Sequence, residues 1–167
     1  MIGRVVRALA LPLVVPGIVP WLLAAREGAP GRWPPAPAEA LASLVLAAAG
    51  LALLGATVHL FATEGQGTLV PWDPPRRLVV RGIYRHVRNP MITGVFLVIL
   101  GEAVVLASPA VGSWFVAVML INLVYIPLSE EPGLDRRFGD AYRVYKRNVP
   151  RWIPRLSPWS GGDAPLP

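Results

Sequence analysis

The sequence predicts an all-α integral membrane protein with about four transmembrane helices, a cytoplasmic C-terminal amphipathic helix and both termini in the cytoplasm. Hydrophobic residues make up 54% of the 167 residues and charged residues only 16%, whereas a soluble domain carries about a quarter charged residues. Four apolar stretches approach the roughly 20 residues that a helix needs to cross a bilayer. The chain has no cysteine and only two histidines, so no metal site is expected.

The four apolar stretches are residues 8–25, 40–62, 91–107 and 114–128. The first contains three prolines four residues apart, so we expect it to be kinked. Arginines ahead of it also fit a signal peptide, but its proline-broken length favours a retained span. The second stretch is uninterrupted, and Ala48, Ala52 and Gly55 form a candidate seam for close helix packing. The short, uncharged joint between the third and fourth stretches predicts a helical hairpin.

The positive charges predict an orientation in the membrane. All of the 16 lysines and arginines except Arg26 and Arg32 lie before the first stretch, between the second and third, or after the fourth. Membrane proteins keep such charges on the cytoplasmic side, so the termini are expected there. Charges placed beside apolar spans also favour a lipid partner over nucleic acid. The richness in Ala, Arg and Pro favours a bacterial inner membrane.

We expect one domain over residues 1–156, with residues 65–94 and 129–155 supplying a polar site, and a disordered tail over residues 157–167. Residues 130–148 are predicted to form one amphipathic helix, and Ser129 is a candidate N-cap. The helix shows apolar residues at the spacing of one face, namely Leu134, Phe138, Ala141, Tyr142 and Tyr145.

The stretch RGIYRHVRNP, residues 81–90, directly precedes the third apolar stretch. One interpretation is simple anchoring, because arginine and tyrosine are common at membrane interfaces. The other is an anion site at the cytoplasmic face. Gly82 permits close backbone approach, Pro90 opens a helix whose first N–H groups favour an anion, and Arg88 can add a bidentate contact to a carboxylate.

Glu130 and Glu131 follow the fourth apolar stretch and also allow two interpretations. They can cap a helix, where carboxylates suit the positive end of the dipole. Alternatively, one carboxylate accepts the hydroxyls of a ribose while the other meets an ammonium. Opposite the arginine stretch, the pair would complete a site for a zwitterion that bears a sugar, such as S-adenosylmethionine.

The segments LVVRGIYRHVRNPMITG and EEPGLDRRFGDAYRVYKRNVPRWIPR resemble the isoprenylcysteine carboxyl methyltransferase family, which is related to the phospholipid N-methyltransferases. The resemblance covers residues 65–155, and Asn89 and Ile92 depart from the eukaryotic pattern, which has His and Tyr there. Because Asn does not titrate near neutral pH, an acid–base role is not expected at Asn89. The matching residues are Gly82, Tyr84, Arg85, Arg88, Asn89, Pro90, Gly94, Glu130, Glu131, Phe138, Gly139, Tyr142 and Tyr145.

The resemblance implies that S-adenosylmethionine lies in a cytoplasmic pocket roofed by the C-terminal helix, and that a lipophilic acceptor enters from the bilayer. The product would be S-adenosylhomocysteine. The residues expected to bind the cofactor are Gly82, Tyr84, Arg85, Arg88, Asn89, Pro90, Met91, Gly94, Glu130, Glu131, Tyr142 and Tyr145.

The acceptor decides which side chains take part in the reaction. A carboxylate acceptor needs only a cation to position it, for which Arg88, Arg147 and Arg151 are candidates. An amine acceptor must lose a proton, and Glu102 or Glu131 would then be the base. Glu102 lies within an apolar stretch, where a carboxyl is costly. It is either part of the site or hydrogen-bonded to a neighbour such as Asn122 or His59.

Methyl transfer to a carboxylate is therefore the main functional hypothesis, and methylation of a phospholipid amine is its nearest alternative. A membrane NADPH-dependent reductase and a non-catalytic membrane protein are further alternatives. All the site assignments depend on one expectation: residues 81–90 and the Glu130–Glu131 pair converge on a nucleoside-sized cavity at the inner leaflet. The oligomeric state is left open by the sequence.

Overall fold

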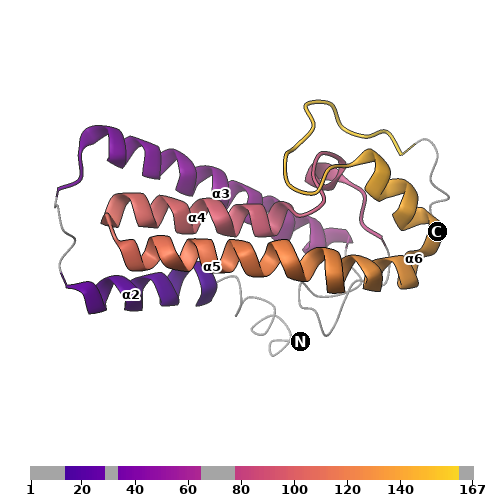
Figure 1. The fold of residues 1–167 in the computed structure, drawn as a ribbon. Helices are drawn as coiled ribbons and strands as arrows, with labels where there is room; N and C mark the ends of the chain where they lie inside the picture. The colour runs from indigo at the N-terminus through magenta and orange to yellow at the C-terminus, as the bar shows by residue number, and fades with distance from the viewer. Residues whose placement is uncertain (1–13, 29–33, 65–77, 162–167) are drawn as a thin grey trace.

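The computed structural model describes residues 14–28, 34–64 and 78–161, and every regular element in these ranges is helical. Figure 1 shows α3, α4 and α5 side by side along most of the molecule, with α6 and the chain after it gathered at one end. The elements in order are η1 Val14–Ile18, α2 Val19–Glu27, α3 Pro37–Glu64, η2 Gly82–Arg85, α4 Pro90–Leu106, α5 Pro109–Tyr125, η3 Ile126–Glu130 and α6 Glu131–Asn148.

Within the described ranges, two helices have the length and hydropathy to cross a membrane. One is Pro37–Leu60 within α3, and the other is the continuous helix Pro109–Asn148, whose apolar part is α5. Helix α4 is as apolar but has 17 residues. The all-helical prediction is confirmed for the described residues, whereas four spans and cytoplasmic termini stay predictions. Residues 8–13 of the first predicted span lie outside the described ranges.

Helices α3 and α4 pack closely because glycines face each other at their crossing. A Cβ added at Gly94 would lie 2.8 Å from the carbonyl oxygen of Gly50, and one added at Gly101 would lie 3.1 Å from that of Ser43. The predicted seam was wrong: Ala48, Ala52 and Gly55 are exposed. Small residues occur on several faces of α3, so their spacing alone did not identify the packed face.

The hairpin between α4 and α5 is confirmed, but its turn is shorter than predicted. Ala107 adopts a left-handed conformation after α4, and the Ser108 hydroxyl caps α5 by accepting from Val111 N. Pro109 then starts α5, five residues before the predicted start at 114, because proline suits the first helical position. Glu27 at the end of α2 bonds to the Ser108 hydroxyl and to the Ala110 amide, which fixes α2 at this turn.

Prolines distort the helices without ending them. Both η1, which contains Pro16, and η3, which contains Pro127, are π-helical, because proline lacks an N–H and clashes with the preceding turn. The predicted irregularity near the first span is thus confirmed. The predicted N-cap at Ser129 was wrong, since the chain is helical on both sides of it and α5 runs through η3 into α6.

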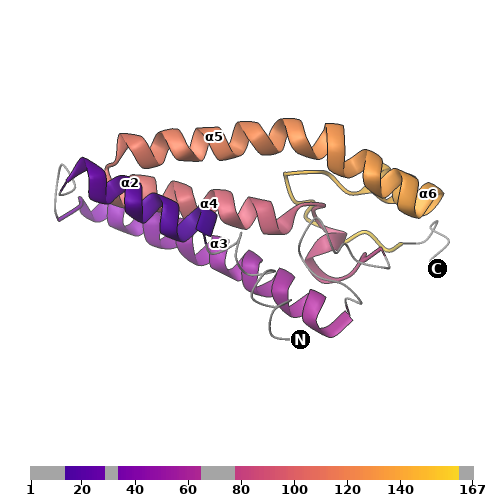
Figure 2. The same ribbon diagram turned by 90° about the horizontal axis from the view of Figure 1, so that it is seen from below.

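Helix α6 bends sharply at Gly139, so residues 130–148 do not form the single straight helix that was predicted. Gly139 has φ 53° and ψ −130°, a conformation essentially restricted to glycine. Lys146 forms an ion pair with Asp135 across the bend, although eleven residues of straight helix would separate them by about 16 Å. The bend is visible in Figure 1, and Figure 2 shows α6 beyond the end of α5 from below.

The chain after α6 is packed onto this same end, which corrects the predicted disordered tail from residue 157. Trp159 is buried and packs against Tyr145, with ring centroids 5.9 Å apart. Its amide donates to the Arg85 carbonyl, and Arg85 Nε donates to the Trp159 carbonyl. Residues 162–167 lie outside the described ranges. The apolar cluster around α6 contains Tyr142, Tyr145, Val149 and Trp159, with Leu78, Val80, Leu134, Phe138 and Val144 around it.

Candidate active site

The turn that precedes α4 is held by α6. Arg81 is extended, Gly82 has φ 51°, and η2 carries the chain to a fully buried Val87. The Tyr145 hydroxyl donates to the Tyr84 carbonyl at 2.7 Å. The two segments that the sequence predicted to supply the site are therefore in contact, except that residues 65–77 lie outside the described ranges.

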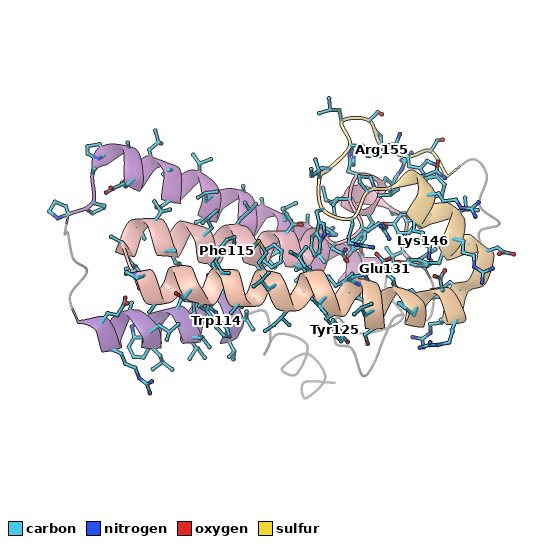
Figure 3. The ribbon with its side chains drawn as sticks, in the orientation of Figure 1. Trp114, Phe115, Tyr125, Glu131, Lys146 and Arg155 are labelled. Carbon is cyan, nitrogen blue, oxygen red and sulfur yellow. The ribbon has the colours of Figure 1, made fainter. Side chains whose placement is uncertain are left out.

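An ion cluster joins three distant parts of the chain at this end. Arg88 Nη1 donates to Glu131 Oε1 at 2.8 Å, while Arg151 donates from Nε to Oε1 at 2.7 Å and from Nη2 to Oε2 at 2.9 Å. Glu131 is 8% exposed. Figure 3 shows Glu131, Lys146 and Arg155 at the same end of the molecule. These contacts confirm that residues 81–90 meet Glu131, while the predicted nucleoside-sized cavity and its place at the inner leaflet stay predictions.

The cluster carries more positive than negative charge. Two guanidiniums share the single Glu131 carboxylate, and the hydrogen bonds that Arg151 donates to Glu131 raise the pKa of Arg151 above its ordinary value. The Tyr142 hydroxyl lies 3.4 Å from Arg88 Nη1. Burial, together with the Glu131 charge, raises the pKa of Tyr142 to about 12, so this hydroxyl keeps its proton. Among the described residues, the buried Arg88 Nε has no hydrogen-bond acceptor.

Glu130 differs from its neighbour, since it is exposed and no ion pair among the described residues involves it. Burial raises the pKa of the Tyr84 hydroxyl above its ordinary value, and the Glu130 charge adds to this shift. The Glu130 charge thus influences Tyr84, while Glu131 lies inside the ion cluster, and partial burial together with the Glu131 charge raises the pKa of Glu130. Neither glutamate is the simple helix cap that was one interpretation, because both lie within continuous helix.

The start of α4 lies beside the chain after α6. Pro90 is buried at the first helical position, as predicted, and the Asn89 side chain does not cap the helix. The Asn89 amide nitrogen instead lies 3.4 Å from the Arg151 carbonyl oxygen, and the Arg88 amide donates to the Pro150 carbonyl. Met91 follows in the first turn of α4 and is half-buried.

Four of the predicted site residues have other positions or contacts than expected. Gly94 lies in the α3–α4 crossing, and Arg85 binds the Trp159 carbonyl. Arg147 is exposed and lies two positions from Tyr145, on the opposite side of α6. Glu102 is fourteen residues from Arg88, about 20 Å along α4.

Glu102 lines a cavity of about 660 Å³ with α2 residues at the far end of the molecule. One of its carboxyl oxygens has no hydrogen-bond partner among the described residues, and the Asn122 amide bonds to the Val118 carbonyl instead. The predicted bond between Glu102 and the Asn122 amide was therefore wrong, and Glu102 lines a cavity far from the ion cluster rather than one beside it.

Sequence reasoning missed the contribution of Trp159, and it expected Trp152 only in a segment that turns back at the headgroup level. The Trp152 ring lies 5.6 Å from that of Phe96, and the Phe96 ring lies 6.2 Å from that of Phe115. A tryptophan in a segment otherwise rich in Ser, Pro and Gly was the available signal for Trp159, since large aromatic side chains dominate packing energy.

Comparisons with known proteins agree with this geometry. A sequence model of the family described as phospholipid methyltransferase matches residues 42–141. The chain is 36% identical over 85 residues to the protein-S-isoprenylcysteine O-methyltransferase of Schizosaccharomyces pombe, a match that covers 47% of this chain and 34% of that relative. The match thus spans about a third of the relative's length. No solved structure matches the chain. With its long apolar helices and more than half of its residues matched, the chain is a membrane protein that belongs to the phospholipid methyltransferase family.

Proposed function

We propose that this protein is an integral membrane methyltransferase that moves a methyl group from S-adenosylmethionine to a lipophilic acceptor. The family and the similarity to an isoprenylcysteine O-methyltransferase support the reaction class. The observation that carries the proposal is the ion cluster of Arg88, Glu131 and Arg151. At the end of the apolar helices, this cluster joins Glu131 to Arg88, which lies 43 residues earlier in the sequence, and to Arg151, which lies 20 residues later.

The charges and hydrogen-bonding groups of the cluster fit the amino-acid part of such a cofactor. Arg88 Nε is a buried donor without an acceptor among the described residues, and leaving such a group unpaired is costly. A carboxylate would satisfy it and would balance the excess positive charge of the two guanidiniums. The exposed Glu130 carboxylate is then available for an ammonium or for ribose hydroxyls. S-adenosylmethionine supplies a methyl group on a sulfonium, which a nucleophile takes by in-line displacement.

The proposed cofactor-binding residues follow from their positions around the cluster. Gly82 and Tyr84 lie in the turn held by Tyr145, and Tyr142 lies beside Arg88. The site is completed by the start of α4, where no side chain caps the first turn. The full proposed set is Gly82, Tyr84, Arg88, Asn89, Pro90, Met91, Glu130, Glu131, Tyr142 and Tyr145.

A carboxylate is the acceptor that the site supports best. It is ionised at neutral pH and needs positioning rather than a base, and Arg151, the more exposed guanidinium of the cluster, can provide that. An amine acceptor would need a base. The lone pairs of Glu131 are already engaged by two arginines, and Glu102 lies at the other end of α4. Methylation of a phospholipid amine remains the second candidate because the matching family is described by that substrate class.

We also propose four membrane spans with the ion cluster on the cytoplasmic side of a bacterial inner membrane. The cations of α6 and of the turn before α4 gather at the end with the cluster, and such charges are retained in the cytoplasm. The proposed spans are residues 8–25, to which η1 and most of α2 belong, and helices α3, α4 and α5, of which α4 lies against α3 along the glycine crossing.

The proposal is tested by transfer of a labelled methyl group from S-adenosylmethionine into a total lipid extract, followed by mass identification of the product. Wild-type protein should form a methyl ester on a lipophilic acid, and Arg88→Ala and Glu131→Gln should lose transfer and saturable cofactor binding. Arg136→Ala removes an exposed arginine from the same helix region and should retain both. Selective NADPH binding without transfer would instead support a reductase, and binding of neither compound would support a non-catalytic protein.

A further inference from the structure

Residues 149–160, which we call the strap, return from α6 across the start of α4 and are fixed there. Both ends are buried, at Val149 and Trp159. His86 Nδ1 donates to the Arg155 carbonyl at 2.8 Å. Backbone hydrogen bonds between the strap and the turn before α4 join Arg88 N to Pro150 O, Arg155 N to His86 O and Trp159 N to Arg85 O.

Between these fixed points, two large apolar side chains of the strap face outward. Ile153 is 80% exposed and Leu156 is fully exposed. Isolated exposed apolar residues are common on proteins and need no explanation by themselves. What Ile153 and Leu156 contact depends on where the strap lies relative to the apolar helices.

The aromatic contacts fix that position. Trp152 packs on Phe96, which lies six residues after Pro90 and therefore about 9 Å along α4. Gly94, two residues before Phe96, lies against Gly50 in the middle of the Pro37–Leu60 span. The Trp152 ring is therefore level with apolar parts of both α3 and α4, and Ile153 follows it directly in the chain.

The composition of the strap suits the boundary between lipid and water. Arg151 and Arg155 are its only charged residues, and it contains no carboxylate. Tryptophan is enriched at membrane interfaces, and arginines near the surface are attracted to anionic lipids. In Figure 3 Arg155 lies by the strap, on the side of the molecule away from α5.

We propose that the strap is a membrane-contact surface whose Ile153 and Leu156 side chains insert into the lipid leaflet next to the ion cluster. Arg155 then lies at the level of the headgroups. Arg151, which holds Glu131, is two residues from Ile153, so the membrane contact also steadies one side of the ion cluster. The proposal depends on the membrane position of α3 and α4 and not on methyl transfer.

Because the natural chain has no cysteine, single labels can test this directly. Ile153→Cys and Leu156→Cys are labelled with an environment-sensitive fluorophore, and the full chain is reconstituted in nanodiscs of phosphatidylcholine and phosphatidylglycerol. Lipids that carry a nitroxide at a shallow acyl position should quench most of the fluorescence at both sites. Arg137→Cys, exposed on the first half of α6, is the matched control and should stay bright.

Quenching at 153 and 156 no greater than at 137 would overturn the proposal. So would a label that is shielded from water but insensitive to the nitroxide lipid, because that result indicates a protein partner or a second copy of the chain. Both positions are exposed, so neither substitution removes a packing contact, and the thermal midpoint of each labelled protein verifies the fold. The readout requires no enzymatic activity, so it can succeed or fail independently of the proposed function.

Discussion

Replacing Glu131 by glutamine should destabilise the protein far more than the same change at Glu130. Glutamine keeps one acceptor but turns the other into an NH2 donor, which faces guanidinium donors. The Glu131 carboxylate receives three hydrogen bonds from two arginines. A hydrogen bond to a charged group is worth about 1.5–3 kcal/mol, and breaking a fully buried ion pair costs about 3–5 kcal/mol.

The Arg151 side chain is 31% exposed, so water screens part of its interaction. We therefore expect Glu131→Gln to lower the free energy of unfolding by about 2–4 kcal/mol, which corresponds to a fall of about 5–15 °C in thermal midpoint for a chain of this size. Glu130 is exposed, and Glu130→Gln should change stability by less than about 0.5 kcal/mol.

The assay is thermal unfolding of both variants and wild type in one detergent at neutral pH and low salt. The two variants make the same chemical change at adjacent residues, so effects of net charge cancel in the comparison. Equal midpoints for the two variants would show that the cluster does not hold α6 against the start of α4. A loss of cofactor binding in Glu130→Gln without a change in midpoint would separate binding from folding.

Gly94→Ala places a Cβ 2.8 Å from the Gly50 carbonyl oxygen and should cost about 1–3 kcal/mol, whereas Gly55→Ala, with no atom within 4 Å, should have little effect on the midpoint. Gly139→Ala should cost about 1–3 kcal/mol because of its positive φ, and limited proteolysis should then cut at the bend, unlike in Gly133→Ala. Burial raises the pKa of Tyr142 to about 12. The protonated hydroxyl therefore contributes fully to the free energy of unfolding below pH 10, and this contribution is lost between pH 10 and 12, because the tyrosine ionises first in the unfolded chain. Tyr142→Phe should therefore make the fall in midpoint over that range shallower, and an unchanged slope would contradict the burial of this hydroxyl.

Features that are set by residues close together in the sequence were predictable. Apolar length predicted the helices, and Pro90 marked the start of α4 because proline is tolerated at the first helical position. The apolar spacing of Tyr142 and Tyr145 correctly identified the buried face of α6. The order of charges along the chain, together with the family resemblance, led to the expectation that residues 81–90 lie beside Glu131.

Features that depend on which faces of two helices meet were not predictable from one sequence. Small residues lie on several faces of α3, and the close contacts of Gly94 with Gly50 and of Gly101 with Ser43 show which of them are packed. The same difficulty affected Gly94 itself, because a glycine that permits ligand approach and a glycine that permits helix approach look identical in the sequence. The packing of Trp159 was missed for a related reason, since its position is decided by a partner 74 residues away, Arg85.

The position of Glu102 along α4 limits the part it can take in a proposed mechanism. A carboxyl in an apolar span is a reasonable functional candidate, but α4 rises about 1.5 Å per residue. It therefore carries Glu102 to the turn where Glu27 binds Ser108. A methyl group bound near Arg88 is out of reach of that carboxyl. The acid–base chemistry that an amine acceptor requires has to come from the exposed Glu130 or from the acceptor itself, whereas a carboxylate acceptor requires only the guanidiniums already assembled around Glu131. The architecture of the cluster thus favours ester formation over amine methylation.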